Sequence, residues 1–321
     1  MNSSDPDHGL LVITGATGWV GRTAAHELQR LLTPENFLER VRLFASRSGS
    51  ILSTGYTGLS PFSIPVFPLK GLTDLAASES LSGVLHTAFL TRDRVAQVGQ
   101  HDYVATNRWI TAQVASALTA SPQARAVVIS SGAAAVYDQE LGTDLGSDPY
   151  GVLKWEEEQL LSSLVPRSLV LRLYALSGRF IRDPSRFALG DFLLKALSRQ
   201  PIRIDSTNPV LRSYGHAGNI TAFAWRWVLN NNSNPFRNIL AATSVTTDLL
   251  ELAQEITRVY NLPPVQSSVD PAAVPNRYIA DSEPFLAALS QHGLVSMSIE
   301  DQLHDTTRGL SNLEQTNICD D

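Results

Sequence analysis

The sequence TGATGWVG at residues 14–21 decides the fold of this chain. Its glycines have the spacing G-x-x-G-x-x-G and lie between an apolar run and a helical pattern. A pyrophosphate needs close approach of the backbone and N–H groups at a helix N-terminus, and Gly15 and Gly18 allow both. Gly21 would let the helix pack closely on the sheet. The turn therefore predicts dinucleotide binding, with a merely structural turn as the alternative. The expected cofactor contacts are Gly15, Thr17, Gly18, Trp19, Val20 and Gly21.

Short apolar runs alternate with helical patterns through the first half of the chain, which is typical of an α/β protein. We therefore expect a Rossmann-type, doubly wound parallel sheet with a smaller C-terminal substrate-binding region. The expected strands are 10–14, 41–45, 64–69, 83–89, 126–131 and 168–174, and the expected helices are 19–32, 106–118 and 150–164.

The alternation loosens after residue 175, where helical patterns follow one another with fewer apolar runs between them. An apolar run at 238–243 and an amphipathic helix at 247–260 could return to the sheet. We therefore expect an NAD(P)-binding core over residues 1–175, which 238–260 rejoins. The substrate-binding region is expected over 176–237 and 261–321.

The end of the second expected strand selects the cofactor. An NAD site usually has an Asp or Glu there for the ribose hydroxyls, whereas an NADP site has an Arg. Here the chain has Ser46 and Arg47 and no acid. The arginine could pair with a 2′-phosphate while the serine donates a hydrogen bond. The sequence favours NADP and leaves NAD possible, and the alternative is a solvated surface arginine.

Tyr150 and Lys154 lie one turn apart on an expected helix. A tyrosine is a poor acid–base catalyst at its normal pKa of about 10, and a nearby ammonium together with a cationic nicotinamide is expected to lower that pKa. The preceding strand ends in Ser130 and Ser131, where a hydroxyl could polarise a substrate carbonyl. The pair therefore predicts catalysis, with a surface helix pair as the alternative. The acids at 156–158 are expected to form a solvated face.

Further pieces of the chain join the glycine turn and the Tyr/Lys pair. They are LHTAF at 85–89, Tyr103 with Asn107, ISS at 129–131, PYGVLK at 149–154, LRLYALSG at 171–178 and LRSYGHAGNI at 211–220. In this order they resemble the extended short-chain dehydrogenase/reductases of the NAD-dependent epimerase/dehydratase family. The resemblance implies a nicotinamide cofactor and Ser/Thr-Tyr-Lys chemistry. The implied substrate is a nucleotide-activated sugar, which reacts by hydride transfer through a keto intermediate.

The resemblance assigns roles near the expected cofactor. It implies that Tyr150 is the catalytic acid/base and that Lys154 is its electrostatic partner, both touching the cofactor. Ser131 is the expected carbonyl hydroxyl, with Ser130 as the fallback. Ala88 and Asn107 are also expected to contact the cofactor, although an ordinary polar helix residue explains Asn107 equally well.

The resemblance also assigns substrate residues and an assembly. Arg212 is expected to contact a nucleotide-sugar diphosphate, and His216 to line the substrate cleft or to cap or pack a helix. A homodimer is expected through the helices near 105–119 and 150–164. The apolar positions that could face either the partner or the sheet are Ile110, Val114 and Leu161.

The chain departs from the family pattern at several positions. The usual catalytic Ser/Thr position before a Val-Tyr pair is Ala133, the usual Asn after the sixth strand is Ala175, and a usual Asp is Asn219. These departures keep two alternatives open. One is an NADPH-dependent reductase of a smaller carbonyl compound, and the other is a cofactor-binding protein without catalysis.

Composition limits the remaining possibilities. The chain has 321 residues, 43% of them hydrophobic, and a net charge of −6, so it can bury a large core and shows no basic face for nucleic acid. No apolar run is long enough for a membrane span and no signal-peptide pattern is visible, so we expect a cytoplasmic protein. The single Cys319 excludes a disulfide framework, and no Cys/His cluster surrounds His86, so no metal site is expected.

Overall fold

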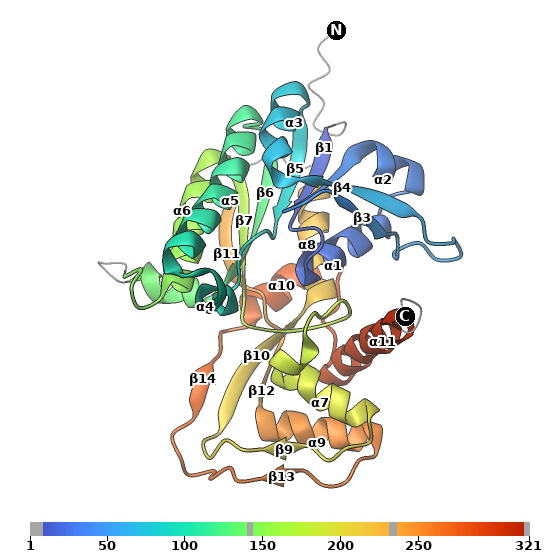
Figure 1. Cartoon of the computed structure of the whole chain (residues 1–321), viewed down its shortest axis with the longest axis vertical. Coiled ribbons are helices and arrows are strands. Elements are labelled where there is room, and N and C mark those ends of the chain that lie inside the picture. The colour runs from blue at the N-terminus through green and yellow to red at the C-terminus, as the bar shows by residue number, and fades with distance from the viewer. Residues whose placement is uncertain (1–8, 140–143, 231–235, 318–321) are drawn as a thin grey trace. The chain divides into compact units, whose positions relative to one another are not determined.

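The computed structural model describes residues 9–139, 144–230 and 236–317 (Figure 1). The chain folds into two compact units. The first unit combines Met1–Arg172 with Thr221–Leu240, and the second unit combines Leu173–Ile220 with Ala241–Asp321. Each unit is therefore built from two separate stretches of sequence.

An eight-stranded sheet forms the centre of the first unit, in the order β11-β7-β6-β5-β1-β2-β4-β3. β1 pairs in parallel with β2 and β5, whereas β3 is antiparallel to β4. The strand order reverses at β1, as in a doubly wound sheet, which confirms the expected α/β fold. The strands are β1 Leu10–Thr14, β2 Val41–Ala45, β3 Gly49–Leu52, β4 Ser63–Pro68, β5 Leu81–His86, β6 Arg125–Ser131, β7 Arg167–Leu173 and β11 Phe236–Ala241.

Helices cover both faces of this sheet (Figure 1). On one face, Val114 of α5 and Leu161 of α6 belong to the same buried apolar cluster as Val12 of β1. On the other face, the Trp225 indole of α8 donates to the Ala24 carbonyl of α1 at 2.8 Å. A strand covered on both faces is apolar at every position, which explains the sequence LLVIT of β1. The helices are α1 Trp19–Gln29, α2 Pro34–Arg40, α3 Leu72–Ser78, α4 Val95–Val98, α5 Gln100–Ala120, α6 Pro149–Leu164 and α8 Ala217–Leu229, with short turns η2 Leu69–Gly71, η3 Arg92–Arg94 and η4 Gly132–Asp138.

Several elements of the structure are not predicted by the sequence, among them α2 and β3. Thr33 caps α2 by accepting a hydrogen bond from the Asn36 N–H at 3.3 Å, and Pro34 follows at the first helical position. Both are recognised signals for the start of a helix. In β3 only Ile51 is buried, because the strand lies at the edge of the sheet. A strand with a single buried position lacks the alternation that would predict it.

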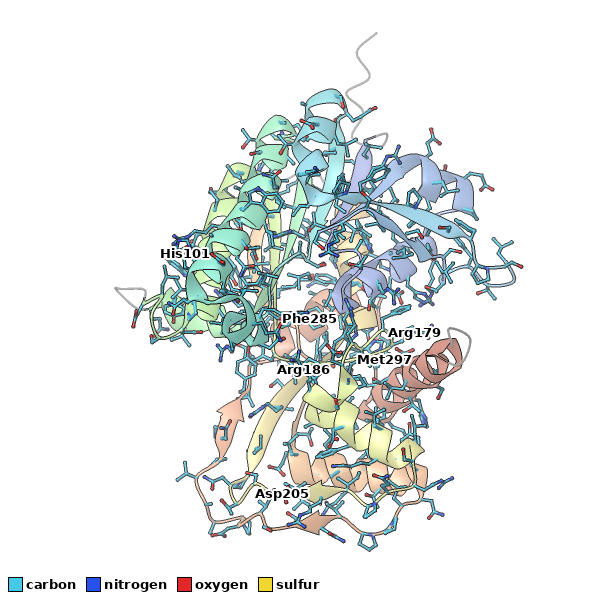
Figure 2. The ribbon with its side chains drawn as sticks, viewed as in Figure 1. His101, Arg179, Arg186, Asp205, Phe285 and Met297 are labelled. Atoms are coloured by element: carbon cyan, nitrogen blue, oxygen red, sulfur yellow. The ribbon has the colours of Figure 1, made fainter. Side chains whose placement is uncertain are left out.

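The second unit has smaller sheets and four helices among its described residues. β10 pairs with β12, β14 and β8, and β9 pairs with β13. Phe285 of α10 is buried with 1% of its surface exposed (Figure 2). The strands are β8 Ala175–Ser177, β9 Arg203–Ile204, β10 Val210–His216, β12 Val245–Asp248, β13 Gln266–Ser267 and β14 Asn276–Tyr278. The helices are α7 Ala188–Leu197, α9 Leu249–Tyr260, α10 Glu283–Gln291 and α11 Ile299–Asn317, with the turn η5 Pro184–Arg186.

The stretch 238–260, expected to rejoin the core, is divided between the two units. β11 enters the large sheet, whereas β12 and α9 belong to the second unit. The reason is local: Asp248 ends β12, accepts the Val210 N–H at 2.9 Å and forms a capping box with Glu251 at the start of α9. The strand and the helix are thereby tied to β10.

Across the ranges that the structure describes, no helix is both long and apolar enough to span a membrane.

Candidate active site

The glycine turn joins β1 to α1. Gly15 has φ +68°, a conformation that side chains disfavour, and a Cβ there would lie 2.6 Å from Thr87 Oγ1. A Cβ on Gly21 would strike the Gly15 carbonyl oxygen. Gly18 donates its N–H to that oxygen at 2.9 Å and begins the helix without a capping side chain. The turn is therefore compact, and it presents the start of α1 as a dinucleotide-binding turn does.

The turn lies where the strand order reverses. Thr14 ends β1 and His86 ends the neighbouring β5, and these two residues are partners in the ladder. Thr87 Oγ1 donates to the Thr14 carbonyl at 2.7 Å, which places Ala88 beside the turn. Ligands of open α/β sheets bind in the crevice at such a reversal. The expected contacts at 15–21 and Ala88 thus come together at one end of the sheet.

Ser46 and Arg47 follow β2 and are both exposed. The Ala16 N–H donates to the Phe44 carbonyl at 2.9 Å, so the end of β2 is tied to the glycine turn. The two residues therefore begin the loop nearest to the turn, at the position where the cofactor ribose is expected.

Asn107 is 1% exposed and points at the loop after β5. Its Oδ1 accepts the Leu90 N–H at 2.8 Å, and the Tyr103 hydroxyl donates to the Leu90 carbonyl at 2.7 Å. These bonds fix the backbone that follows Ala88. The geometry favours the ordinary structural role that the sequence left open for Asn107.

Tyr150 and Ser131 meet at the carboxyl end of β6. Asp148 caps α6 by accepting the Gly151 N–H at 3.1 Å, and this starts the helix beside the strand end. The Ser131 hydroxyl is hydrogen-bonded to Tyr150 and also accepts the Ala133 N–H at 3.2 Å. Among the residues that the structure describes, the buried Ser130 Oγ has no hydrogen-bond partner. The geometry therefore favours Ser131 over Ser130 as the hydroxyl that works with Tyr150.

Lys154 is not among the groups that lower the pKa of Tyr150 in the structure, and the expected lowering by Lys154 together with a cationic nicotinamide stays a prediction. Burial raises the pKa of the Tyr150 phenol above its ordinary value, and the hydrogen bond from Ser131 and the charge of Arg92 only partly oppose this rise. Lys154 is itself 4% exposed and forms an ion pair with Glu157 at 2.8 Å. Its positive charge is therefore largely balanced before it can act on the phenol.

Sequence reasoning missed the residues that surround the Tyr/Lys pair. Glu157 is buried between Lys154 and His86, so it is not part of a solvated face. We call His86, Lys154 and Glu157 the α6 cluster. The Arg92 guanidinium lies 5.3 Å from the centre of the Tyr150 ring. Finding Glu157 from the sequence would have required knowing which side chains of α6 are buried. No sequence pattern pointed to Arg92.

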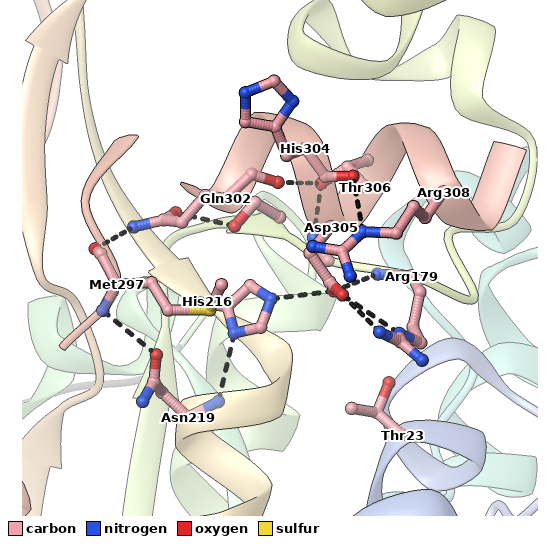
Figure 3. A network of polar contacts seen from close by, with 12 residues as sticks. Thr23, Arg179, His216, Asn219, Met297, Gln302, His304, Asp305, Thr306 and Arg308 are labelled. Carbon is pink, nitrogen blue, oxygen red and sulfur yellow. Dashed lines mark hydrogen bonds and ion pairs between the residues drawn. The ribbon is translucent and has the colours of Figure 1, made fainter. Parts of the chain in front are cut away.

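The expected substrate residues Arg212 and His216 lie on β10 in the second unit. Arg212 is half-buried and donates to the Asn276 side-chain oxygen at 3.0 Å. His216 uses both ring nitrogens: Nδ1 lies 3.2 Å from the Asn219 N–H, and Nε2 lies 3.0 Å from Asp305 Oδ2 (Figure 3). This geometry favours the packing role that the sequence left open for His216.

Asp305 on α11 also binds Arg179, at 2.7 Å from Nη2 (Figure 3). We call Arg179, His216 and Asp305 the α11 cluster. Burial alone would raise the pKa of Asp305, but hydrogen bonds from His216 and Arg179 hold it well below its ordinary value. Among the described residues, no group of three or more His, Cys, Asp or Glu is arranged to hold a metal ion.

Comparison with solved structures shows which folds the chain shares. UDP-glucose-4-epimerase from Stenotrophomonas maltophila, with bound NAD and formylated UDP-arabinopyranose, has a TM-score of 0.70 at 19% identity, over 96% of this chain and 100% of that one. UDP-N-acetylglucosamine 4-epimerase from Methanobrevibacter ruminantium M1, in complex with UDP-N-acetylmuramic acid, has a TM-score of 0.69 at 15% identity, over 95% and 99%. The NAD-dependent NDP-hexosamine 5,6-dehydratase TunA, involved in tunicamycin biosynthesis, has a TM-score of 0.65 at 17% identity, over 94% and 97%. At these identities the likeness establishes a common fold.

No curated protein matches the chain. The model of the NAD dependent epimerase/dehydratase family matches residues 11–242, from β1 through β11. That range includes the glycine turn, Ser131 and the Tyr/Lys pair, which carried the expected resemblance. The resemblance is confirmed, and the chain belongs to the NAD dependent epimerase/dehydratase family.

Proposed function

We propose that the chain is a nicotinamide-dependent enzyme that acts on a nucleotide-activated sugar by hydride transfer through a keto intermediate. The observation that carries this proposal is the hydrogen-bonded pair of Ser131 and Tyr150. The pair lies at the same end of the parallel strands as the glycine turn. Two hydroxyls beside a dinucleotide-binding turn are suited to a carbonyl oxygen that gains or loses a proton.

The raised pKa of Tyr150 suits the side chain to act first as a general acid. Because its pKa is raised, the phenol keeps its proton at neutral pH and can protonate a keto oxygen. Ser131 can hydrogen-bond the same oxygen and stabilise the charge that develops on it. A bound nicotinamide would supply or accept the hydride at the carbon.

The cofactor would lie against the turn at 15–21. Gly15 and Gly21 have no room for a Cβ, which keeps the backbone compact where a pyrophosphate must approach. We propose NAD as the cofactor, because relatives of this fold are described with NAD and the family is described as NAD dependent. The preference for NADP that Arg47 suggested finds no support in these comparisons.

The choice between the two cofactors can be measured. Calorimetric titration of the chain with NAD and with NADP compares their affinities directly. An Arg47→Ala variant should bind NAD as the wild type does, because NAD has no 2′-phosphate for this exposed arginine. If NADP binds more tightly than NAD, and Arg47→Ala removes the difference, the proposal of NAD is wrong.

The substrate class comes from the names of the relatives, which are epimerases and a dehydratase of UDP- or NDP-linked sugars. Arg212 is the proposed diphosphate contact of the second unit, because its guanidinium is half-buried and held in place by Asn276. Whether the outcome is epimerisation, dehydration or reduction depends on the pocket, since all three pass through a keto species.

A cofactor-binding protein without catalysis is the second candidate function. The observation that favours it is that Lys154 already has three partners. Its Nζ donates to the Ile129 carbonyl at 3.0 Å and to Glu157 at 2.8 Å, and it lies 3.8 Å from the centre of the Phe89 ring. An ammonium has three N–H donors, so the two hydrogen bonds leave one N–H, and a ribose hydroxyl that accepted it would compete with the Phe89 ring.

We also propose a homodimer through α5 and α6. Ile110, Val114 and Leu161 are buried in the apolar cluster under the helices, so they face the sheet and not a partner. The outward positions Trp109 and Leu160 are instead 45% and 44% exposed. Light scattering should give the mass of two chains at micromolar concentration, and a Trp109→Glu variant should give the mass of one.

The Tyr150→Phe substitution tests the proposed function. It deletes the phenol proton and keeps the ring, so turnover of a UDP-sugar should fall by about 10²–10⁴-fold. Cofactor affinity should change little, because the glycine turn is untouched. The measurement is kcat on a panel of UDP-sugars beside calorimetric cofactor titration. Wild-type kcat in Tyr150→Phe would refute the proposed site, and cofactor binding with no turnover by the wild type would favour the second candidate.

A further inference from the structure

Three consecutive glutamates on α6 have three different surroundings. Glu156 is partly exposed and forms an ion pair with Arg108 at 2.9 Å. Glu157 and Glu158 are each 1% exposed, and Glu158 serves a separate ion pair. Glu157 is the one that contacts Lys154, the proposed partner of the catalytic tyrosine. Its burial therefore calls for a functional explanation.

Glu157 is the centre of a continuous set of hydrogen bonds. Its Oε2 accepts from Lys154 Nζ at 2.8 Å, and its Oε1 lies 2.9 Å from His86 Nε2 and accepts from the Thr111 hydroxyl at 3.2 Å. On the far side of the imidazole, His86 Nδ1 lies 2.6 Å from Thr14 Oγ1. The set runs from the end of β1 to the lysine one helical turn from Tyr150.

The carboxylate in this position is charged. Burial alone would raise the pKa of Glu157, but the charges of Lys154 and His86 outweigh burial and lower the pKa to about 2. A buried anion without such partners would be strongly destabilising. Glu157 and Lys154 therefore form a buried pair whose charges offset one another.

Tyr150 lies one helical turn before Lys154 on the same helix, α6. The negative charge of Glu157 raises the pKa of the phenol, together with burial and Asp148 at the start of α6. Arg92 of η3 lowers it, and Tyr103 of α5 is the other titratable group that interacts with the phenol. With the charge of Lys154 offset by Glu157, the phenol stays protonated at neutral pH.

We propose that Glu157 is a positioning residue for Lys154 whose charge also acts directly on Tyr150. Its carboxylate and the Ile129 carbonyl fix the ammonium, and its negative charge offsets that of the ammonium and favours the protonated form of the phenol. The inference deepens the proposed function and rests on it for the catalytic meaning of Tyr150. The electrostatic coupling of Glu157 to the phenol holds whether or not a sugar is turned over.

The decisive variant is Glu157→Gln, which keeps the shape of the side chain and removes its charge. The readout is ionisation of Tyr150, taken as the phenolate absorbance of each protein minus that of the same protein carrying Tyr150→Phe. The midpoint should fall by about one pH unit, a tenfold change in the ionisation constant. Glu156→Gln, the exposed neighbour on the same helix, should leave the midpoint unchanged.

A second comparison guards against a variant that fails to fold because Lys154 is left as an unpaired cation. Lys154→Met alone leaves the Glu157 anion unbalanced, whereas Lys154→Met with Glu157→Gln removes both charges. The midpoint of Tyr150 should be lower in the double variant than in Lys154→Met. Equal midpoints in that comparison, or equal midpoints in Glu157→Gln and the wild type, would overturn the proposal.

The pH profile of kcat separates this proposal from the proposed function. If a UDP-sugar is turned over, the limb assigned to Tyr150 should move to lower pH in Glu157→Gln and stay in place in Glu156→Gln. If no sugar is turned over but the absorbance midpoint moves, the coupling stands and the proposed function fails. Turnover whose profile does not respond to Glu157→Gln would defeat this inference and leave the proposed function intact.

Discussion

The α6 cluster of the first unit and the α11 cluster of the second have the same chemistry and different surroundings. Each places a buried carboxylate between a histidine and a cation. In the α6 cluster the cation is Lys154, whose side chain is 5% exposed, whereas in the α11 cluster Arg179 is 34% exposed. The Lys154 ammonium lies one helical turn from a phenol.

Arg179 lies instead in a strained segment. Gly178 has φ +118° and Phe180 has φ +69°, and the Arg179 N–H donates to Asp305 Oδ2 at 3.0 Å. The α11 cluster therefore holds a backbone conformation in place. The comparison shows that a carboxylate between a histidine and a cation does not by itself mark a catalytic site. Whether such a cluster belongs to a catalytic site depends on the group that its cation lies beside.

The largest expected effect on stability is that of Asp305→Ala. It leaves Arg179 and His216 without their anion, and breaking a buried ion pair costs about 3–5 kcal/mol. Urea unfolding should show this loss, while calorimetric binding of NAD to the first unit should persist. Asp205→Ala is the matched control, because Asp205 and Arg203 form an exposed pair, 76% and 69% exposed (Figure 2). If the two variants unfold at the same urea concentration, the α11 cluster does not stabilise the fold.

Acid should weaken both clusters. The pKa of Glu157 is lowered to about 2 in the folded chain, so its stabilisation is complete above the ordinary value of 4.5 and is lost as the pH falls from there toward 2. The loss from this one group is roughly 3 kcal/mol, from 4.5 to about 2. The pKa of Asp305 is also lowered in the folded chain, so its contribution to stability is likewise lost as the pH falls.

Urea unfolding at a series of pH values measures this dependence. Glu157→Gln and Asp305→Asn should each flatten the fall in stability below pH 4.5, the ordinary pKa of Glu157. The clusters share no residue, so the double variant should show the sum of the two effects. A variant whose acid sensitivity equals that of the wild type would show that its carboxylate is not favoured in its charged form by folding.

Two buried threonines give the smallest and sharpest comparison. Thr14 Oγ1 accepts the Thr87 N–H at 3.2 Å beside the α6 cluster, and Thr306 Oγ1 accepts the Gly178 N–H at 2.8 Å beside the α11 cluster. Substitution by valine removes the acceptor of the Thr87 and Ala88 N–H groups in the first case and of the Gly178 N–H in the second, and should cost about 1–2 kcal/mol.

The two valine variants should differ in turnover. Thr14→Val should also change kcat, because Thr14 contacts His86 of the α6 cluster. Thr306→Val should leave kcat as it is. Equal kcat in both variants would mean that the polar connection from Thr14 to Lys154 has no catalytic consequence.

The sequence predicted much of the first unit, and the reason is physical. Buried parallel strands are mostly apolar, and 41–45, in which only Arg42 is polar, was found with the bounds of β2. The glycine turn was found because its backbone conformation excludes other residues. The pairing of Ser131 with Tyr150 followed from strand ends that meet at one edge of the sheet.

Other contacts could not be predicted, because they depend on which side of an element is covered. Glu157 was expected in solvent since a run of acids does not reveal which of its members turns inward. From the sequence, Ile110 could have faced either a partner or the sheet. In the structure it is buried in the apolar cluster between α5 and the sheet. Arg179 and Asp305 are far apart in sequence, and no local pattern links them.

The interleaving of the two units has a consequence for the order of synthesis. The chain leaves the first unit at Arg172 and returns at Thr221, so most of α8 and β11 emerge from the ribosome after the first stretch of the second unit, Leu173–Ile220. Until Leu240 has emerged, the outer edge of β7 and the sheet face beneath α8 remain uncovered. Open strand edges recruit other chains, and contacts between distant segments form slowly. We therefore expect a chain truncated at Arg172 to aggregate more readily than the full chain, because part of its large sheet is uncovered.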